Sequence, residues 1–276
     1  MNKIDLHLHT NYSDGIFSPK EVLELAAKNE YTIISITDHD TLDGYRAAQE
    51  INHKYDLKIL PGVEVSSYYK NRDVHILAYD IAPDDQEFNE LLEYIQKSRY
   101  IRAERIIENL EKLGISVDFE RVKALAGKNV LIARPHIARA MVENGTCKST
   151  QEAFDNYIGN ESPAYVLKKT PTVDEIIESI HRAGGVAVLA HPHTLFNDSY
   201  IYDFVEMDLD GLEVFYAKYD EHTVDHYDEI AQKNNLIRTG GSDFHGMLND
   251  FNYFGDRSAP HYVVEEIKYR AKRYKY

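Results

Sequence analysis

Short apolar segments that end in histidine or carboxylate residues recur along the chain, and this pattern constrains the fold more than any other feature. Seven of these segments are rich in Ile, Val and Leu and are bounded by Gly, Pro or Asp, as β-strands are. We predict strands over Lys3–Leu8, Thr32–Thr37, Lys58–Val65, Asp73–Tyr79, Val186–Ala190, Gly211–Phe215 and Ile237–Gly241. Helical patterns separate most of them, so the sequence predicts a parallel α/β fold. Seven strands with chemistry at their ends favour a barrel over an open sheet.

Helix-start signals support this alternation of strands and helices. Ser18 and Glu21, with Pro19 at the first helical position, form a capping-box pattern that predicts a helix to about Asn29. Residues 172–175 form a second such pattern, for a helix that ends at 184–185, and a third helix is expected over 219–234.

The stretch from Ser98 to Thr170 breaks the alternation, because its pattern predicts helices only. A long helix is expected to reach Leu113, followed by helices over 118–126, 134–144 and 149–158. This stretch is too long for an ordinary connection. We therefore predict a discontinuous barrel domain, 1–97 and 171–276, and an inserted helical cap subdomain, 98–170, over the mouth of the barrel.

Composition and charge exclude several classes of protein. The chain is 43% apolar, as globular proteins are, and its longest apolar runs fall far short of the roughly 20 residues that span a bilayer. Its first residues lack the apolar core of a signal peptide, so we expect a cytoplasmic protein without a membrane partner. A net charge of −15 disfavours long nucleic acid. If several acidic groups bind metal ions, the site is more positive than the net charge suggests, so small anionic substrates are still compatible with this chain.

Nine histidine and carboxylate side chains at the predicted strand ends are candidate metal ligands. His7 and His9 are two residues apart, so they project from the same face of an extended chain. Imidazole and carboxylate together suit zinc, iron and manganese, and nine such groups exceed what one ion can use. A bridging carboxylate, which we assign to Glu64, would let two ions share a water and lower its pKa. The candidates are His7, His9, Asp14, His39, Glu64, His75, His191, Asp243 and His245.

These segments resemble the motifs of the polymerase and histidinol phosphatase (PHP) family. The motifs that carry the resemblance span nearly the whole chain: Asp5–Thr10 with Ser13–Gly15, Ile36–Asp40, Pro61–Glu64, His75–Leu77, Ala190–Pro192 and Gly241–His245. The resemblance implies a distorted, TIM-like, seven-stranded β/α barrel with a trinuclear metal centre. It implies three ligand sets: His7, His9, Glu64 and Asp243; Glu64, His75 and His191; and Asp14, His39 and His245.

Two further segments narrow the resemblance within the family. Ser98–Arg105, followed by Leu113-Gly114, and Arg134–Ala138 look like small stand-alone members: nucleoside 3′,5′-bisphosphate phosphatases and 5′-to-3′ exonucleases that act on very short RNA. The sequence departs from several characterised relatives at residues 193–195, where His-Thr-Leu replaces Gly-Arg-Tyr.

Basic residues in the insertion are candidates to bind substrate phosphate. Arg99, Arg102 and Arg105 recur every three residues and are candidates for a phosphate clamp. The alternative is that they lie on a solvated helix face and pair with acidic neighbours. Arg134 precedes Pro135 at a predicted helix start, and its guanidinium fork suits a phosphate. The predicted substrate-binding residues are Arg99, Arg102, Arg134, His136 and Lys168.

The sequence therefore predicts a phosphoesterase that uses two to three Mn, Fe or Zn ions to hydrolyse a small phosphorylated nucleotide. We expect a nucleoside 3′,5′-bisphosphate as substrate, with very short RNA as a further one. Glu64, His191 and Asp243 are the predicted catalytic residues. The general acid is unassigned, and the role of Glu213 is open. The alternatives are a histidinol-phosphate phosphatase and, from another class, a non-catalytic metal-binding regulatory module.

Overall fold

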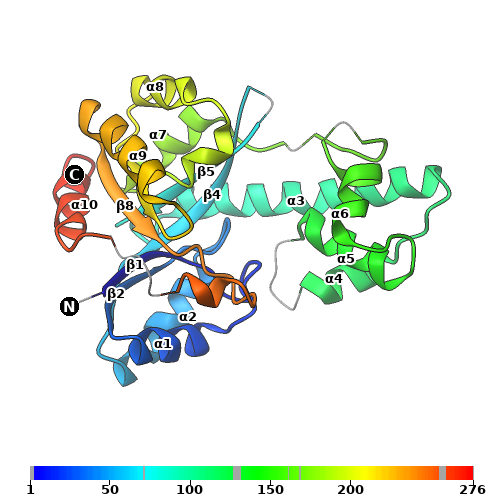
Figure 1. Ribbon diagram of the computed structural model, residues 1–276, viewed down its shortest axis with the longest axis horizontal. Coiled ribbons are helices and arrows are strands. Elements are labelled where there is room, and N and C mark those ends of the chain that lie inside the picture. The colour runs from blue at the N-terminus through cyan, green and yellow to red at the C-terminus, as the bar shows by residue number, and fades with distance from the viewer. Residues whose placement is uncertain are drawn as a thin grey trace. The chain divides into compact units, whose positions relative to one another are not determined.

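The computed structural model describes residues 3–70, 72–126, 132–160, 162–167, 169–254 and 259–275 (Figure 1). Contacts within the chain divide it into two units, residues 1–92 with 171–276 and residues 93–170. The helical unit thus begins at Glu93, whereas the sequence suggested Ser98, because helix α3, Gln86–Lys112, runs across the boundary. The expected position of the helical unit over a barrel mouth stays a prediction.

The strands of the first unit form two sheets. The three-stranded sheet has the order β1-β2-β3 and is parallel, and the five-stranded sheet has the order β4 to β8. The predicted α/β class is confirmed, whereas a closed seven-stranded barrel is not, because the described strands pair as two separate sheets. The strands are β1 Lys3–Leu8, β2 Tyr31–Ile36, β3 Lys58–Ile59, β4 Gly62–Tyr69, β5 Arg72–Tyr79, β6 Val186–Leu189, β7 Gly211–Tyr216 and β8 Ile237–Gly241.

Two predictions about the strands are wrong. The segment Lys58–Val65 is not one strand, because it contains Pro61, which has no N–H to donate to a ladder, and the chain changes sheet there. The sheet is also not wholly parallel, since β5 runs antiparallel to both β4 and β6. His75 therefore lies in the first half of its strand and not at its end. The reversed direction of β5 still places it beside Ser66, two residues after Glu64.

A few contacts join the two sheets. Leu8 pairs with Phe244, and His39 pairs with Glu64, as isolated bridges between segments of different sheets. The fully buried Tyr79 of β5 donates its hydroxyl hydrogen to the carbonyl of Leu6 in β1, at 2.8 Å. The two sheets therefore meet beside residues that the sequence singles out as ligands.

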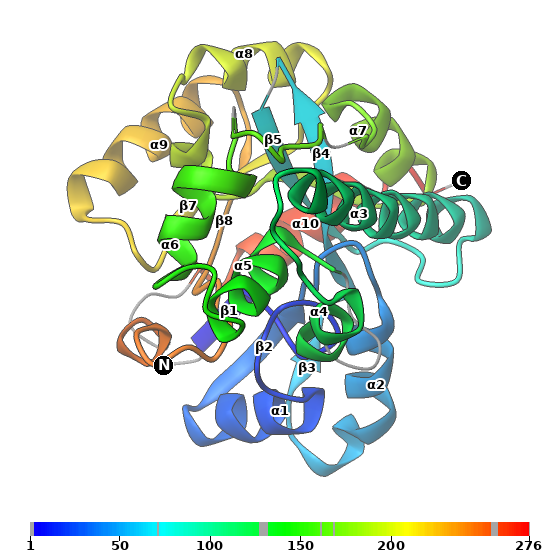
Figure 2. The same cartoon turned by 90° about the vertical axis from the view of Figure 1, so that its right-hand side faces the viewer.

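Helices of the first unit cover these sheets. Helices α1 and α2 pack on β2, α7 packs on β4 to β6, α9 packs on β7 and β8, and α10 packs on β6 and β8 (Figure 2). The predicted Ser18–Glu21 capping box is present at the start of α1. The helices are α1 Pro19–Lys28, α2 Asp43–Ile51, α7 Val173–Arg182, α8 Ser199–Glu206, α9 Glu221–Lys233 and α10 Val263–Ala271, with 3₁₀ turns η1 Asn52–Lys54, η3 Pro192–Leu195 and η4 Asp250–Asn252.

The second unit has a hydrophobic core of its own. Leu110 of α3 is fully buried with Val122, Ile137 and Ile158 from the helices that follow. Those helices are α4 Phe119–Ala126, α5 Arg134–Glu143 and α6 Thr150–Ala153, which continues as a π-helical turn, η2 Phe154–Ile158. Among the helices that the structure describes, none is both long and apolar enough to cross a membrane.

Replacement of Tyr79 by Phe tests the bond between the sheets. Tyr79→Phe should lower the free energy of unfolding by about 1–2 kcal/mol, because the buried Leu6 carbonyl loses its hydroxyl partner while the ring volume is kept. Urea unfolding measures the change. Tyr269→Phe, on the exposed face of α10, is the matched control and should leave the midpoint unchanged. Equal midpoints for both variants would show that the bond contributes nothing.

Candidate metal centre

The Glu64 carboxylate lies at the centre of the predicted ligands. It is fully buried on β4, and five imidazoles approach its two oxygens within 3.2 Å. Oε2 faces His7 Nε2, His9 Nε2 and His39 Nδ1, each at 3.2 Å. Oε1 faces His75 Nδ1 and His191 Nε2, each at 2.9 Å. One carboxylate is therefore shared by five histidines from four segments of the chain.

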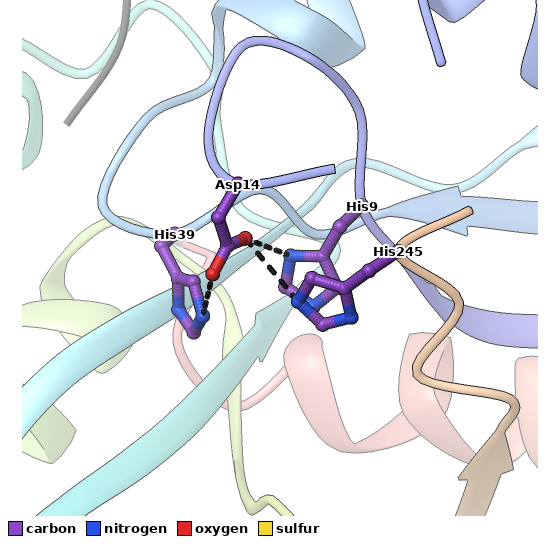
Figure 3. A group of neighbouring side chains, drawn as sticks. All are labelled: His9, Asp14, His39 and His245. Carbon is purple, nitrogen blue, oxygen red and sulfur yellow. Dashed lines mark ion pairs between the residues drawn. The ribbon is translucent and has the colours of Figure 1, made fainter. Parts of the chain in front are cut away.

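The Asp14 carboxylate forms a second group with histidines. Figure 3 shows it between the His39 ring on one side and the rings of His9 and His245 on the other. Its Oδ2 lies 3.5 Å from His39 Nε2, and its Oδ1 lies 3.2 Å from His245 Nε2 and 3.7 Å from His9 Nδ1. The ligand atoms of this group all lie within 4.8 Å of one another, so one ion could contact them all.

Asp243 contributes one oxygen to the cluster and holds the other outside it. Its Oδ1 lies 3.3 Å from His9 Nε2 and 3.5 Å from His7 Nε2. Its Oδ2 accepts a hydrogen bond of 2.8 Å from the Tyr216 hydroxyl and lies 3.5 Å from Lys218 Nζ. Asp243 has φ 51°, an uncommon value for a residue other than glycine, so the local fold holds this side chain in place against backbone strain.

The structure brings the nine predicted ligands together, and most of their ligand atoms converge in three overlapping groups. The first set, His7, His9, Glu64 and Asp243, is one group of converging atoms. His39, Glu64 and His75 form a second group of converging atoms. In the second predicted set, His191 stands in the place of His39. His191 approaches the cluster through Glu64. His9 joins the third set of Asp14, His39 and His245.

The buried carboxylates stay ionised in this environment. Burial raises the pKa of Glu64, but the surrounding imidazoles together outweigh burial and hold the pKa well below its usual range. The same balance holds the pKa of Asp14 and that of Asp243 well below the usual range. Three neighbouring carboxylates therefore keep their negative charge, and charge of this kind needs cations close by.

Protons alone satisfy this cluster poorly. Burial lowers the pKa of His9, but the adjacent carboxylates of Asp243 and Glu64 outweigh burial and raise the pKa to about 10. Burial lowers the pKa of the adjacent His39 to about 3, although Glu64 and Asp14 act against it. Both ring nitrogens of His9 and Nδ1 of His39 are buried and make no hydrogen bond within the described residues. Converging donors of this kind fit divalent metal ions.

Carboxylates that were not predicted as ligands hold the ligand loops in place. The buried Asp38 accepts hydrogen bonds from the Thr10 amide at 2.7 Å, the Thr10 hydroxyl at 2.6 Å and the Ser13 hydroxyl at 2.6 Å, and so fixes the loop that carries Asp14. A β-carbon at Gly44 would lie 1.9 Å from Asp38 Oδ2, so glycine is required there. Asp5 likewise accepts from the amides of His7 and Ser242, which ties β1 to the segment after β8.

Glu213 has a positioning role that the sequence left open. It is fully buried on β7, and its Oε1 lies 2.8 Å from His7 Nδ1. Its Oε2 accepts from the His191 amide at 2.7 Å, and His191 has the strained φ of 28°. A carboxylate on Nδ1 fixes the tautomer that leaves the Nε2 lone pair for a metal. Glu213 therefore orients two predicted ligands at once.

The predicted substrate-binding residues fall in the helical unit. Arg134 Nη1 donates to Asn160 Oδ1 at 2.9 Å, and Arg102 Nε donates to the Val166 carbonyl at 2.8 Å. Both guanidinium groups lie over the Tyr165 ring, at 5.8 and 5.6 Å from its centroid. His136 is buried at the start of α5, and its ring accepts from the Ala133 amide at 3.1 Å.

Arg99 lies half-buried on α3, and Lys168 lies outside the described residues. Binding of substrate by Arg99, Arg102, Arg134, His136 and Lys168 stays a prediction.

Comparisons with known proteins agree with this site. The model of the PHP domain family matches residues 5–268. A 5′-3′ exoribonuclease of Haemophilus influenzae is 31% identical over 88% of this chain and 90% of its own length. A 3′,5′-nucleoside bisphosphate phosphatase of Chromobacterium violaceum is 31% identical over 89% of this chain and 88% of its own. A crystal structure from Bifidobacterium adolescentis, assigned as a metal-dependent phosphoesterase, superposes with a TM-score of 0.85 at 30% identity, covering 98% of this chain and 96% of that one.

Glu213→Gln tests the positioning role. The amide cannot accept from both His7 and the His191 backbone, because one of its two polar atoms is a donor. We expect the dissociation constant for Mn²⁺, measured by titration calorimetry, to rise about 10- to 100-fold while the fold is retained. Glu229→Gln, on the exposed face of α9, is the matched control. An unchanged Mn²⁺ affinity in Glu213→Gln would exclude this role.

Proposed function

The chain belongs to the PHP domain family of metal-dependent phosphoesterases, and from this membership we propose that it hydrolyses a phosphomonoester of a nucleoside 3′,5′-bisphosphate. The observation that carries the proposal is the convergence of buried carboxylates and imidazoles on Glu64. The predicted resemblance to this family and the predicted class of phosphoester hydrolase are confirmed. A non-catalytic module and a histidinol-phosphate phosphatase are not favoured.

The cluster is proposed to hold two to three divalent ions, which are Mn, Fe or Zn. Glu64 would bridge ions held by His7, His9 and Asp243 on one side and by His75 and His191 on the other. Asp14, His39 and His245 would hold a third. His9 and His39 each face two groups, and a neutral imidazole has one lone pair to donate, so their tautomers decide how the ligands are shared. Such ions supply an activated water and neutralise charge on the reacting phosphate.

The side chains of the chain divide the remaining work. Glu64 and Asp243 keep their negative charge in the buried site, so they hold cations where the phosphate must react. His191 is proposed as a catalytic residue because its ring contacts Glu64. Glu213 holds His191 in this position by accepting a hydrogen bond from its amide. The residues of the helical unit that are proposed to bind the second phosphate are Arg99, Arg102, Arg134, His136 and Lys168. A guanidinium such as that of Arg134 can contact two phosphate oxygens at once.

Very short 5′-phosphorylated RNA is a second proposed substrate. The similarity to the Haemophilus influenzae exoribonuclease supports it. Removal of a nucleotide from the 5′ end breaks a phosphoester as well, so the same cluster could serve both reactions. The two activities would then differ only in how the rest of the substrate is held.

Removal of the metal or of the Glu64 charge should abolish the reaction. Purified protein with adenosine 3′,5′-bisphosphate and Mn²⁺ should release phosphate, and a chelator should stop the release until Mn²⁺ is restored. Glu64→Gln should reduce turnover to background, because a neutral amide cannot bridge two cations. Glu229→Gln is the control for charge, and circular dichroism is the control for fold. Full activity in chelator, or activity of Glu64→Gln within tenfold of the parent, would contradict the mechanism.

Arg134→Ala tests which of the two substrate phosphates Arg134 contacts. A desolvated hydrogen bond to a charged group is worth about 2–3 kcal/mol. We therefore expect kcat/KM on the bisphosphate to fall about 30- to 150-fold. The loss on an aryl phosphate should be much smaller, since that substrate has no second phosphate. Arg139→Ala, exposed on the same helix, is the matched control. Equal losses on both substrates would assign Arg134 to the reacting phosphate or to the fold.

A further inference from the structure

Charge is distributed very unevenly between the two units. Residues 93–170 carry 13 Lys and Arg against 10 Asp and Glu, whereas the rest of the chain carries 18 against 36. The net charge of −15 therefore hides a helical unit that is slightly basic. Because a basic surface attracts phosphate chains, this unit is where an extended anionic ligand would bind.

A basic cavity of about 380 Å³ lies within the helical unit, between α3 and the residues Val166, Leu167 and Lys169. Its volume falls in the range of about 300–1,000 Å³ that is common for ligand sites. Lys97, Arg102, Arg105 and Lys169 line it, and none of its described lining residues is acidic. Lys97 is paired only loosely with the exposed Glu93, at 3.5 Å. Such an exposed pair is weak, so the ammonium is available to a phosphate.

Side-chain hydrogen bonds hold the two walls of this cavity together. The Ser98 hydroxyl of α3 donates to the Lys169 carbonyl at 2.5 Å. One turn further along α3, Arg102 Nε donates to the Val166 carbonyl at 2.8 Å. The cavity is therefore formed before any ligand arrives, which lowers the entropy lost on binding.

Apolar side chains line the same cavity and are exposed to solvent. Tyr94 is 54% exposed, Ile101 48% and Leu167 53%. Tyr94 and Ile101 lie on the face of α3 that also presents Ser98 and Arg105, because these residues are spaced four, three and four apart. An aromatic ring beside several cations suits a ligand with a flat face and a phosphate, since bases stack on aromatic rings while lysine and arginine bind the backbone.

We propose that this cavity binds a nucleotide of a short single-stranded RNA, other than the nucleotide whose phosphate reacts. The inference rests on the proposed function and extends it, because it gives the chain a means to prefer an oligonucleotide over a mononucleotide. A bisphosphate would need only the residues assigned to its two phosphates. A longer strand would also place a base against Tyr94 and backbone phosphates near Lys97 and Arg105.

Equilibrium binding tests the cavity without relying on catalysis. The probe is a fluorescent 5′-phosphorylated hexaribonucleotide, bound in chelator so that it is not cleaved. Combined replacement of Lys97 and Arg105 by Ala should weaken binding roughly tenfold and reduce the slope of log K against log salt by about 1.4, at about 0.7 per phosphate contact on a single strand. Lys112→Ala, exposed on the same helix, should change binding little. Equal effects in the two proteins would overturn the proposal.

Two further measurements distinguish recognition of a nucleobase from binding of any polyanion. Tyr94→Ala should weaken hexamer binding about fivefold or more with no change in salt slope, and Tyr94→Phe should restore it. A hexaglutamate peptide should not compete with the RNA. Competition at similar concentration, or full affinity in Tyr94→Ala, would overturn the assignment to a nucleotide.

Turnover distinguishes failure of this inference from failure of the proposed function. The Lys97 and Arg105 double variant should lose kcat/KM on the hexamer and retain it on adenosine 3′,5′-bisphosphate. Equal losses on both substrates would overturn the separate role of the cavity. A parent protein that is inactive on both substrates but binds the hexamer through Tyr94 would refute the proposed reaction and leave the cavity supported.

Discussion

An ionised carboxylate taken out of water is stable only when positive charge surrounds it, and much of the first unit is organised around that requirement at Glu64. Removing a single ion from water costs several kcal/mol even after the protein relaxes. Here two more ionised carboxylates, those of Asp14 and Asp243, stand beside the same imidazoles. The histidines cannot all take protons, because burial keeps His39 neutral while its neighbour His9 is drawn to the charged form. Divalent cations can neutralise all three carboxylates, whereas protons on the histidines cannot.

The same requirement explains why so many buried polar residues surround the ligands. Asp38 and Asp5 contact loops and backbone amides, and Glu213 contacts both a ring and an amide. They restrict loops that would otherwise separate under the repulsion of like charges. The two sheets also meet here, through the bridge between His39 and Glu64, so the geometry of the centre and the packing of the sheets are coupled.

Local signals explain what could be predicted from the sequence. Ser18 and Glu21 act on each other within one turn, and the two-residue spacing of His7 and His9 places both on one face, so these features are visible in a short window. The family and the reaction class follow from motifs of that kind. Strand direction is not local, because an apolar run looks the same in a parallel and an antiparallel pair, and β5 was therefore misassigned. Likewise, nothing near Glu213 in the sequence indicates His7, which lies 206 residues away.

The antiparallel pairing of β5 with β6 also bears on how the chain reaches this structure. Tyr79 pairs with Val186, and the whole helical unit lies between them in the sequence. The entropy cost of closing a loop rises only slowly, by about 0.6 kcal/mol for each doubling of its length, but it must be met before the pairing stabilises anything. The helical unit has its own core and mostly local contacts, so it can form first and shorten the loop that remains. Its early folding would make the long-range pairing of the sheet faster, independently of any contribution to binding.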